Sequence, residues 1–393
     1  MPGARLVDAR GNSYDAGDSA AGDLAALFAA AGRGDEFCLT PNGLEILAPA
    51  SLGTLPSFQC ETSGTSGTPK RIRRTQASWL ASIVIDRARF GIGPGSSVGV
   101  LGGLESSLAL YGAVEALCLG ADLHVVGGMR PDRQLARLDA QRVSLLWATP
   151  TQVRQLAACG RPCASLRHLL VGGGRFDRAT REMASQLFPG AEITEFYGSA
   201  ETSFITLTSK DTPDGSVGRA YAGVVLEIRG ADGQVQAADS PGEIWVRSPY
   251  LFTGYARGGS DHTKRDGPWL TIGETGALDE SGHLRIGARA GRMVTVSDRN
   301  VSLDAVEEVL LGLDGVAQAG VVAMPDPLRG QILAGVLQCS GCADPEVILR
   351  QARAALGATV APRRLVTIDH WPQLASGKTD YAALRARLDG DGK

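Results

Sequence analysis

The chain has 393 residues, of which 44% are hydrophobic and 21% are charged, and its formal net charge is −3. This length exceeds what a single hydrophobic core usually holds, so we expect two domains, one of them large. The slight acidic excess argues against a nucleic-acid-binding surface, and no apolar run approaches the ~20 residues of a membrane span. Seven cysteines, an odd number, and the lack of a signal peptide argue against a secreted disulfide framework, so we expect a cytoplasmic protein.

The first part of the chain holds one chemically distinctive stretch. A short helix is predicted over Asp23–Ala31, and a hairpin between residues 37 and 47 turns at Pro41-Asn42-Gly43. Residues 62–70 read Thr-Ser-Gly-Thr-Ser-Gly-Thr-Pro-Lys. Glycine lets backbone amides face a bound oxyanion, hydroxyls add donors, and lysine adds a mobile charge. We interpret this stretch as a phosphate-binding loop; the alternative from the segment alone is a flexible surface loop.

Other glycine-rich motifs are excluded by their spacing. In a Walker loop glycine directly precedes the lysine, but Pro69 precedes Lys70, and the second candidate, Gly377-Lys378-Thr379, has Pro372 where glycine is required. The glycines that begin at residue 172 do not fit the dinucleotide-binding pattern. Residues 64–67 lack the additional residue that a nucleophile elbow needs after its serine.

The middle of the chain alternates short apolar strands with amphipathic helices, which predicts a parallel sheet covered on both faces. In such sheets ligands bind beyond the carboxyl ends of the strands, where Gly172-Gly173-Gly174 and Tyr197-Gly198 fall. The predicted strands are 97–102, 123–126, 143–148, 166–171 and 193–196, and the predicted helices are 108–119, 131–141, 150–158 and 177–188.

The remaining sequence predicts two further units. Short strands separated by Gly/Asp turns, from about residue 217 to 287, indicate a small β subdomain. Beyond Arg289 a separate α+β pattern indicates a second domain, with the boundary near Ala290-Gly291-Arg292. Its predicted elements are strands 293–296, 317–322 and 364–368 and helices 302–311 and 345–356.

Five segments resemble, in the right order, motifs of the adenylate-forming superfamily of acyl- and aryl-CoA synthetases, peptide-synthetase adenylation domains and firefly luciferase. They are the loop 62–70, Tyr197-Gly-Ser-Ala-Glu201, Gly242-Glu-Ile-Trp-Val-Arg247 with Gly254-Tyr255, the run from Trp269 through Asp279 to Arg289, and Ser376-Gly-Lys378. The resemblance implies an α/β, adenylate-forming fold. Residues 1–289 would form a large domain, with a parallel α/β sheet and a small β subdomain, that binds ATP and the acid. Residues 290–393 would form a mobile α+β lid. Family members have a longer segment before the phosphate loop, so the N-terminal region here is shortened.

The resemblance also implies a two-step reaction. A carboxylic acid attacks the α-phosphate of Mg²⁺-bound ATP, giving an acyl-adenylate and pyrophosphate, and a thiol of CoA or phosphopantetheine then displaces AMP. Lys378 would offset the negative charge of the first step, and Glu201 would help to hold Mg²⁺. Tyr197 would stack on adenine, Glu274 would accept the ribose hydroxyls, and Arg292 would be the hinge between domains. The ATP-binding residues implied are Thr62, Ser63, Gly64, Thr65, Ser66, Gly67, Thr68, Lys70, Gly173, Gly174, Tyr197, Gly198, Ser199, Glu274 and Arg289.

Several residues depart from the family pattern. Ala200 replaces a threonine that would face phosphate, for which Ser199 or Thr202 would have to compensate, and Glu274 replaces an aspartate. Glu105 stands about where many members have a histidine beside the acyl site. Asp298 replaces a glycine of the loop that lines the pantetheine tunnel, so the thiol step is less strongly indicated than adenylation.

These departures leave three functions open. The first is an acid–CoA ligase, and the second an adenylating enzyme that loads an acyl carrier protein, an amine or a hydroxyl. The third is a non-catalytic descendant that binds a nucleotide. The basic residues that follow Lys70 (Arg71, Arg73 and Arg74) are interpreted as attracting a triphosphate rather than a nucleic acid. The acid itself and the oligomeric state do not follow from the sequence.

Overall fold

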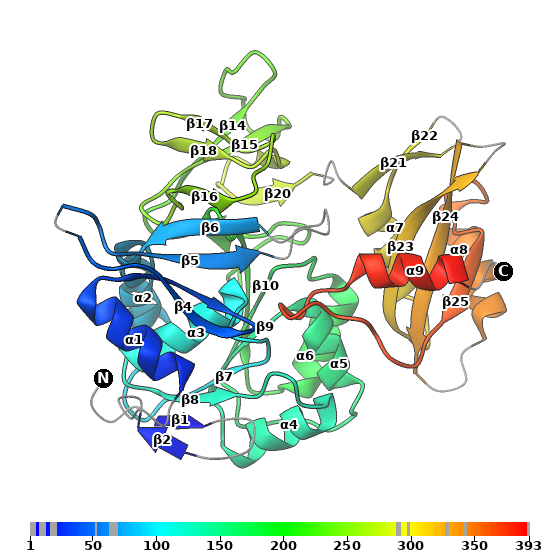
Figure 1. The fold of residues 1–393 in the computed structure, drawn as a ribbon. Coiled ribbons are helices and arrows are strands. Elements are labelled where there is room, and N and C mark those ends of the chain that lie inside the picture. The colour runs from blue at the N-terminus through cyan, green and yellow to red at the C-terminus, as the bar shows by residue number, and fades with distance from the viewer. Residues whose placement is uncertain are drawn as a thin grey trace.

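The structure is a computed structural model that describes residues 5–7, 13–15, 22–51, 53–62, 70–287, 292–296, 299–326, 330–340 and 344–390 (Figure 1). A nine-stranded sheet lies at the centre of the larger, N-terminal part of the chain. Its strands are β1 (Arg5–Val7), β2 (Ser13–Asp15), β7 (Ser97–Val100), β8 (Asp122–Val125), β9 (Leu145–Ala148), β10 (His168–Gly172), β11 (Glu192–Ser199), β12 (Ser203–Leu207) and β13 (Arg219–Ala220).

The strand order in this sheet is β13-β12-β11-β10-β9-β7-β8-β1-β2. The strands from β8 to β11 pair in parallel, as the alternation of strands and helices predicts. The sequence analysis did not predict β12 and β13, which add antiparallel strands beyond β11, or the β1–β2 hairpin at the opposite edge. Tyr197–Ser199 and Gly172 therefore lie at the carboxyl ends of neighbouring parallel strands.

Both faces of the parallel strands are buried, because helices cover each of them. Leu145 and Trp147 of β9 belong to one hydrophobic cluster and Leu146 and Ala148 to another, since successive side chains of a strand point to opposite faces. Helix α3 (Ser107–Cys118) packs into the first cluster together with α2 (Gln76–Phe90). Helices α4 (Pro131–Ala140), α5 (Pro150–Ala157) and α6 (Arg178–Leu187) pack into the second.

Two smaller sheets complete this part of the chain. One has the strand order β16-β6-β5-β3-β4 and packs near helix α1 (Asp23–Arg33). Both this helix and the β3–β4 hairpin were predicted from the sequence. The other is the predicted β subdomain, with the order β17-β18-β15-β19-β20 and β14 paired to β15. Their strands are β3 (Glu36–Thr40), β4 (Gly43–Ala48), β5 (Ser57–Thr62), β6 (Lys70–Thr75), β14 (Val225–Arg229), β15 (Gly242–Arg247), β16 (Gly254–Arg257), β17 (Lys264–Asp266), β18 (Trp269–Thr271), β19 (Thr275–Leu278) and β20 (Leu284–Ile286).

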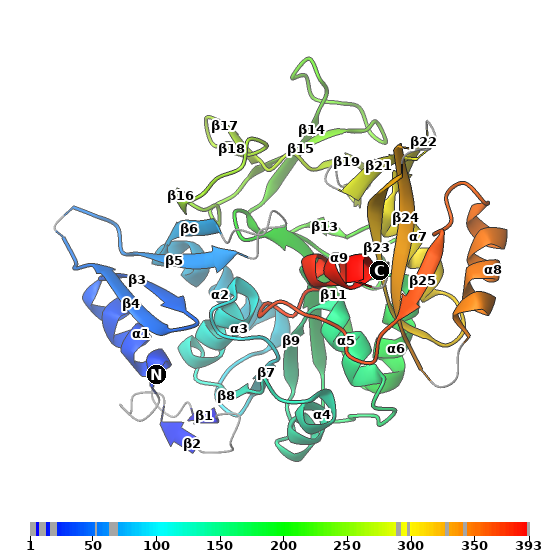
Figure 2. The ribbon, with the colours of Figure 1, turned by 45° about the vertical axis from the view of Figure 1, so that its right-hand side comes forward.

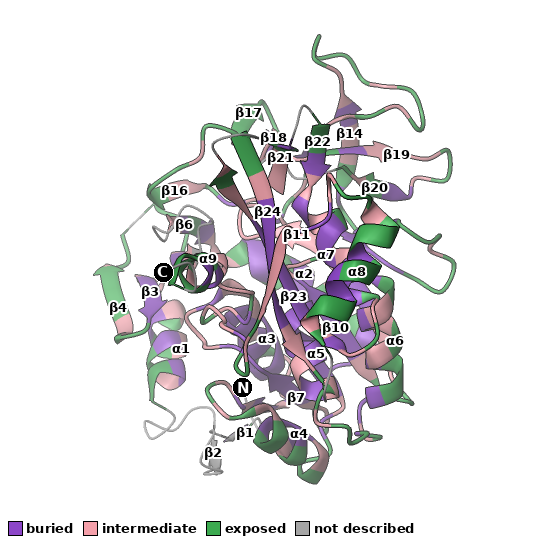
Figure 3. Ribbon diagram, turned by 90° about the vertical axis from the view of Figure 1, so that its right-hand side faces the viewer, coloured by how far each residue is buried: buried purple, intermediate pink, exposed green. Residues whose placement is uncertain are grey.

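The C-terminal residues form a separate α+β unit beside the central sheet (Figure 2). It contains a β21–β22 hairpin and a three-stranded sheet of order β23-β24-β25. Three of its elements, β22, β24 and α9, were not predicted. In Figure 3 much of α8 is coloured as exposed, whereas the middle parts of β23 and β24 are buried and their ends are not. The elements are β21 (Met293–Val296), β22 (Arg299–Ser302), α7 (Leu303–Leu311), β23 (Val316–Asp326), β24 (Gly330–Cys339), α8 (Pro345–Leu356), β25 (Arg364–Thr367) and α9 (Tyr381–Gly390).

Candidate active site

The carboxyl end of β10 is shaped by glycines that leave no room for a side chain. A Cβ on Gly172 would lie 2.3 Å from the ring of Phe196. Gly173 follows with φ +78°, a left-handed conformation that glycine adopts without steric cost. A Cβ on Gly173 would lie 3.0 Å from Cε of Lys378, so the lysine chain passes directly over the glycine backbone. At Gly174 the nearest atom, Cδ of Pro150, would be 3.5 Å away, so this glycine is not sterically required.

Lys378 reaches this position on a loop of the C-terminal unit that inserts between strand ends of the central sheet. Thr149 Oγ1 donates a 2.7 Å hydrogen bond to the carbonyl of Gly377, and the backbone N–H of Gly103 donates to the carbonyl of Ala375 at 3.1 Å. Gly377 has φ +76°, and a Cβ there would collide with Gln152. These contacts place Lys378 beside Gly173, and its predicted role in adenylation stays a prediction.

The two parts of the chain are also joined by a buried polar contact on α5. Arg154 Nε donates to Oε1 of Gln318 at 2.7 Å, and Gln318 Nε2 donates to the carbonyl of Thr151 at 3.1 Å. Gln318 is only 1% exposed. Asp177 lies 3.3 Å from the Arg154 guanidinium, and burial lowers the pKa of that guanidinium. This contact holds the C-terminal unit in the orientation that brings Lys378 to the sheet.

Tyr197 and Glu274 lie together although they are far apart in sequence. The Tyr197 hydroxyl donates a hydrogen bond to a carboxylate oxygen of Glu274, which stands in the loop between β18 and β19. The backbone carbonyl of Glu274 accepts from the N–H of Ile244, which fixes the loop to β15. A phenol ring and a carboxylate are thus placed side by side at the edge of the β subdomain, and their roles toward a nucleotide stay a prediction.

Glu201 is held by a tyrosine of β16. The Tyr255 hydroxyl donates to Oε1 of Glu201 at 2.9 Å and lies 2.9 Å from Oγ1 of Thr263. Lys70 Nζ lies 5.7 Å from the centre of the Tyr255 ring, within the range of a cation–π contact. A carboxylate fixed in this way offers the hard oxygen donor that Mg²⁺ prefers.

The turn that leads into Glu201 uses its hydroxyls internally. Ser199 Oγ accepts hydrogen bonds from the N–H groups of Glu201 and Thr202, each at 3.2 Å, and lies 3.1 Å from Thr202 Oγ1. Thr202 is 1% exposed. The Thr202 hydroxyl therefore serves the turn and does not replace the hydroxyl that Ala200 lacks. Gly198 is required here, because a Cβ would lie 1.9 Å from the carbonyl oxygen of Ser203.

Arg74 is a buried cation beneath this turn. It is 1% exposed and donates to Ser203 Oγ at 2.5 Å and to the carbonyl of Tyr250 at 2.9 Å. Burial lowers the pKa of the Arg74 guanidinium to about 10, although the negative charge of Glu201 opposes this. The predicted role of Arg74 in a basic run that attracts triphosphate is not supported by this burial, because the guanidinium faces the interior.

Arg292, predicted to be the hinge, is anchored within the C-terminal unit. Its guanidinium donates to Asp304 at 2.7 Å and to the carbonyl of Val321 at 3.1 Å, pairs with Glu307, and lies over the Tyr381 ring. Burial alone would lower the pKa of Arg292, but the negative charges of Glu307 and Asp304 outweigh this effect, so the pKa is raised. The side chain of Arg292 is thus fixed within the C-terminal unit, and its role as the hinge stays a prediction.

Several predicted site residues lie outside the described part of the chain, and their placement stays a prediction. These are Ser63, Gly64, Thr65, Ser66, Gly67 and Thr68 of the phosphate loop, the side chain of Thr62, Arg289, and Asp298. Glu105 is described, and its carboxylate folds back over Gly103, where a Cβ would lie 2.3 Å from Oε1.

The sequence analysis missed three residues that organise the site. Thr149 and Gln318 are unremarkable locally, and their roles come from contacts between segments more than 160 positions apart in sequence. Tyr255 belongs to a segment that resembles the family, but nothing in that segment indicates its bond to Glu201. Within the described ranges no helix is long and apolar enough to cross a membrane, and no group of three or more His, Cys, Asp or Glu side chains is arranged for a metal ion.

Comparison with known proteins agrees with this geometry. Residues 56–256 match the family model of AMP-binding enzymes, and residues 305–378 match that of the AMP-binding enzyme C-terminal domain. The chain is 29% identical over 363 residues to the uncharacterized acyl–CoA ligase YhfT of Bacillus subtilis, covering 89% of this chain and 74% of the relative. It is 30% identical over 343 residues to a 2-succinylbenzoate–CoA ligase of Bacillus cereus, covering 84% and 69% respectively.

Solved structures give the same result. The amide bond synthetase McbA of Marinactinospora thermotolerans superposes with a TM-score of 0.70 at 27% identity, covering 87% of this chain and 71% of McbA. The o-succinylbenzoate CoA synthetase MenE of Bacillus subtilis superposes with a TM-score of 0.68 at 25% identity, covering 88% and 71%. With family models matched in both parts of the chain, and adenylate-forming enzymes among its structural neighbours, the chain belongs to the AMP-binding, adenylate-forming enzyme family.

Proposed function

We propose that this protein is an AMP-forming acid–thiol ligase that converts a carboxylic acid to an acyl-adenylate and then transfers the acyl group to CoA. The observation that carries the proposal is the insertion of the Lys378 loop over Gly173, fixed by Thr149 and Gln318. A non-catalytic nucleotide binder would not need a lysine of one domain held against the strand ends of another.

In the first step the acid carboxylate would attack the α-phosphate, and pyrophosphate would leave with the electrons of the broken P–O bond. Negative charge accumulates where the carboxylate and the α-phosphate meet. The ammonium of Lys378, held in a preorganised position, would stabilise this charge. We propose that Tyr197 and Glu274 orient the adenosine part of ATP, and that the phosphate loop, residues 62–68 with Lys70, holds the outer phosphates.

Glu201 is the carboxylate that we propose for Mg²⁺, which would screen the phosphate charges when bound. The hydrogen bond from Tyr255 leaves the carboxylate oriented and restricts its rotamers. Residues 290–393 would act as the lid. Arg292, whose side chain is tied to the C-terminal unit, remains the proposed hinge residue.

The acceptor of the second step is proposed from the relatives. Those named above include CoA ligases, which favour CoA. The similarity to an amide bond synthetase supports a second candidate, an amine acceptor. Both candidates share the adenylation step and differ only in the nucleophile, so one experiment can separate them.

The test is acid-dependent exchange between ATP and labelled pyrophosphate over a panel of aryl, short-chain, long-chain and amino acids. We expect exchange with at least one class and its loss in Lys378→Ala, while ATP binding persists. The active acid is then incubated with ATP and either CoA or a series of amines, and the products are identified by mass spectrometry. ATP binding without exchange for any acid would overturn the proposal in favour of a nucleotide-binding protein.

A further inference from the structure

A polar cavity lies at the amino ends of the parallel strands of the central sheet, opposite the strand ends that carry Gly173 and Tyr197. It has a volume of about 460 Å³ and is lined by residues that precede or begin β7, β8, β9 and β10. Gly172, Gly173 and Tyr197 lie at the carboxyl ends of strands of the same sheet. The cavity is therefore separate from the candidate active site, and its size is in the range of small-molecule pockets.

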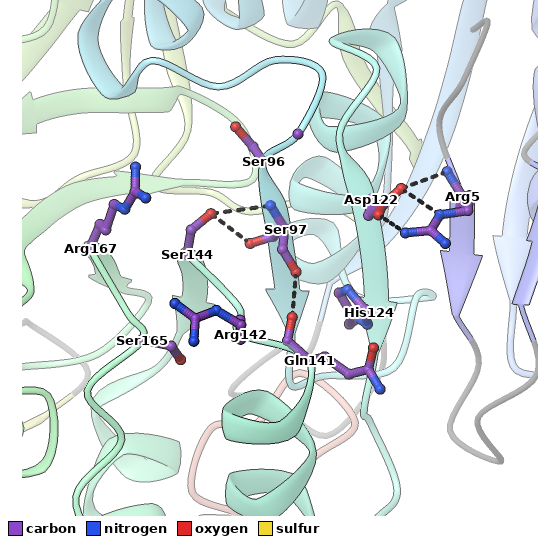
Figure 4. Close-up of a pocket in the computed structure, with 11 residues that line it drawn as sticks. Arg5, Ser96, Ser97, Asp122, His124, Gln141, Arg142, Ser144, Ser165 and Arg167 are labelled. Carbon is purple, nitrogen blue, oxygen red and sulfur yellow. Dashed lines mark hydrogen bonds and ion pairs between the residues drawn. The ribbon is translucent and has the colours of Figure 1, made fainter.

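The walls of this cavity carry an excess of positive charge. Arg5 is neutralised by Asp122, to which it donates at 3.2 and 2.5 Å. Arg142 and Arg167 also line the cavity, and no ion pair with a carboxylate of the described residues is seen for either. In the view of Figure 4, Arg167 lies on one side and the Arg5–Asp122 pair on the other, with Ser144, Arg142 and Ser97 between them.

Arg142 occupies a backbone position that favours glycine. The N–H of Arg142 bonds to the carbonyl of Asp139 at 3.0 Å, and the N–H of Val143 bonds to the carbonyl of Leu138 at 2.9 Å. These two bonds form a Schellman motif at the end of α4, in which the residue after the cap is usually glycine. Arg142 has φ +48°, a conformation that costs a residue with a Cβ roughly 1–2 kcal/mol. The fold alone does not require an arginine there, which points to a use for its guanidinium.

The floor of the cavity is polar, but its two central serines are engaged within the protein. Ser144 Oγ donates to the carbonyl of Ser97 at 3.0 Å and accepts from the Ser97 N–H at 3.1 Å, and Ser97 Oγ donates to the carbonyl of Gln141 at 3.4 Å. His124 lines the cavity, is 3% exposed, and its Nδ1 has no hydrogen-bond partner. Burial lowers the pKa of His124 to about 4, so the ring is neutral at pH 7 and can donate one N–H.

We propose that this cavity binds the phosphate group of a small organic phosphate, with Arg142 and Arg167 as the charged contacts. Guanidinium groups match phosphate oxygens in paired hydrogen bonds. The volume exceeds what an inorganic phosphate ion fills, so the remaining space receives the organic part of the ligand. Glu192, whose N–H donates to the carbonyl of Arg167, does not line the cavity and lies 3.6 Å from His168 Nδ1, so it does not oppose an anion there.

The test is calorimetric titration of the full chain at low ionic strength with glucose 6-phosphate, inorganic phosphate and glucose. We expect glucose 6-phosphate to bind most tightly, inorganic phosphate less tightly, and glucose not at all. The variant Arg142→Gly/Arg167→Gln should bind glucose 6-phosphate at least about tenfold more weakly, because two charge-assisted contacts are lost. Glycine suits φ +48° and Arg167 is exposed, so the double variant keeps its fold, which its melting temperature will verify.

Two control variants locate the binding. The double variant Lys70→Ala/Lys378→Ala changes the candidate nucleotide site and should leave the affinity for glucose 6-phosphate unchanged. Arg350→Gln removes an exposed arginine of α8, far from the cavity lining in sequence, and should also leave this affinity unchanged. Dependence on Lys70 and Lys378 instead of the arginines would overturn the proposal, as would equal binding by the arginine variant or no binding by the wild type. Tighter binding of inorganic phosphate than of the ester would overturn the organic part of the proposal. The outcome does not depend on whether the protein has ligase activity.

Discussion

Replacing Gln318 by alanine tests whether the buried contact between the two parts of the chain places Lys378 for adenylation. The substitution removes a hydrogen bond from the Arg154 guanidinium at 2.7 Å and another to the Thr151 carbonyl at 3.1 Å. Arg154 keeps its contacts with Asp177 and Thr180 inside the large domain. Binding of ATP should therefore be retained, because Tyr197, Glu201 and Glu274 all belong to the large domain.

The size of the effect follows from the two lost bonds. A hydrogen bond to a charged group contributes about 1.5–3 kcal/mol and a neutral one about 0.5–1.5 kcal/mol, so their sum is about 2–4.5 kcal/mol. Since 1.4 kcal/mol corresponds to about a factor of ten, the docked orientation should become roughly 30- to 1600-fold less favoured. If the docked orientation strongly dominates in the wild type, part of this shift only reduces its excess and does not lower the docked population. We therefore expect a loss of ATP–pyrophosphate exchange that is smaller than the shift itself, but at least about tenfold.

The assay is ATP–pyrophosphate exchange with the acid identified in the panel, together with ATP binding by calorimetry. The matched control is Gln338→Ala, because the Gln338 amide donates to the backbone carbonyl of Asp369, within the C-terminal unit. A double variant with Lys378→Ala should be no worse than Lys378→Ala alone, since docking matters only through the lysine. Unchanged exchange in a folded Gln318→Ala variant, or full additivity with Lys378→Ala, would refute the reasoning.

The remaining predictions concern Glu201, Gly172 and Glu195. Tyr255→Phe removes the 2.9 Å hydrogen bond to Glu201 but keeps the ring, so exchange should fall about tenfold and require more Mg²⁺; an unchanged Mg²⁺ dependence would contradict the role of Glu201. Gly172→Ala should lower the free energy of unfolding by about 1–3 kcal/mol through its clash with Phe196, whereas Gly174→Ala should be nearly neutral in the same denaturant titration. Burial raises the pKa of Glu195 to about 7, against the opposing charge of Arg181. The folded state thus favours the protonated form of Glu195. The stability that this group contributes to the fold is fully present below pH 4.5 and is lost as the pH rises through 7. Relative to Glu195→Gln, the free energy of unfolding of the wild type should therefore fall by on the order of 3 kcal/mol between pH 4.5 and 8. If the free energies of unfolding of the two proteins change with pH in the same way, the pKa of Glu195 is not raised.

Local patterns in the sequence were sufficient to predict a helix or strand where the element buries one face or where strands and helices alternate regularly. The parallel strands and their helices from β7 to β11 were predicted in order, because short apolar runs and amphipathic segments are local features. Helix α2 was missed for a physical reason. Its buried face carries Ser82 and Asp86, which bond to Tyr111, while Leu80 and Val84 are exposed, so its apolar residues do not mark the buried side.

The sequence by itself therefore determined the family, the fold class and the motifs that supply Tyr197, Glu201, Glu274 and Lys378. Only the tertiary structure decided which of these side chains meet: the pairing of Tyr197 with Glu274, the support of Glu201 by Tyr255, and the docking of Gln318 that carries Lys378 to Gly173. It also turned Arg74 inward and placed Arg142 and Arg167 around one cavity. The physical reason is that these contacts join segments far apart in the chain. Their geometry depends on the packing of whole domains, which no local pattern of residues records.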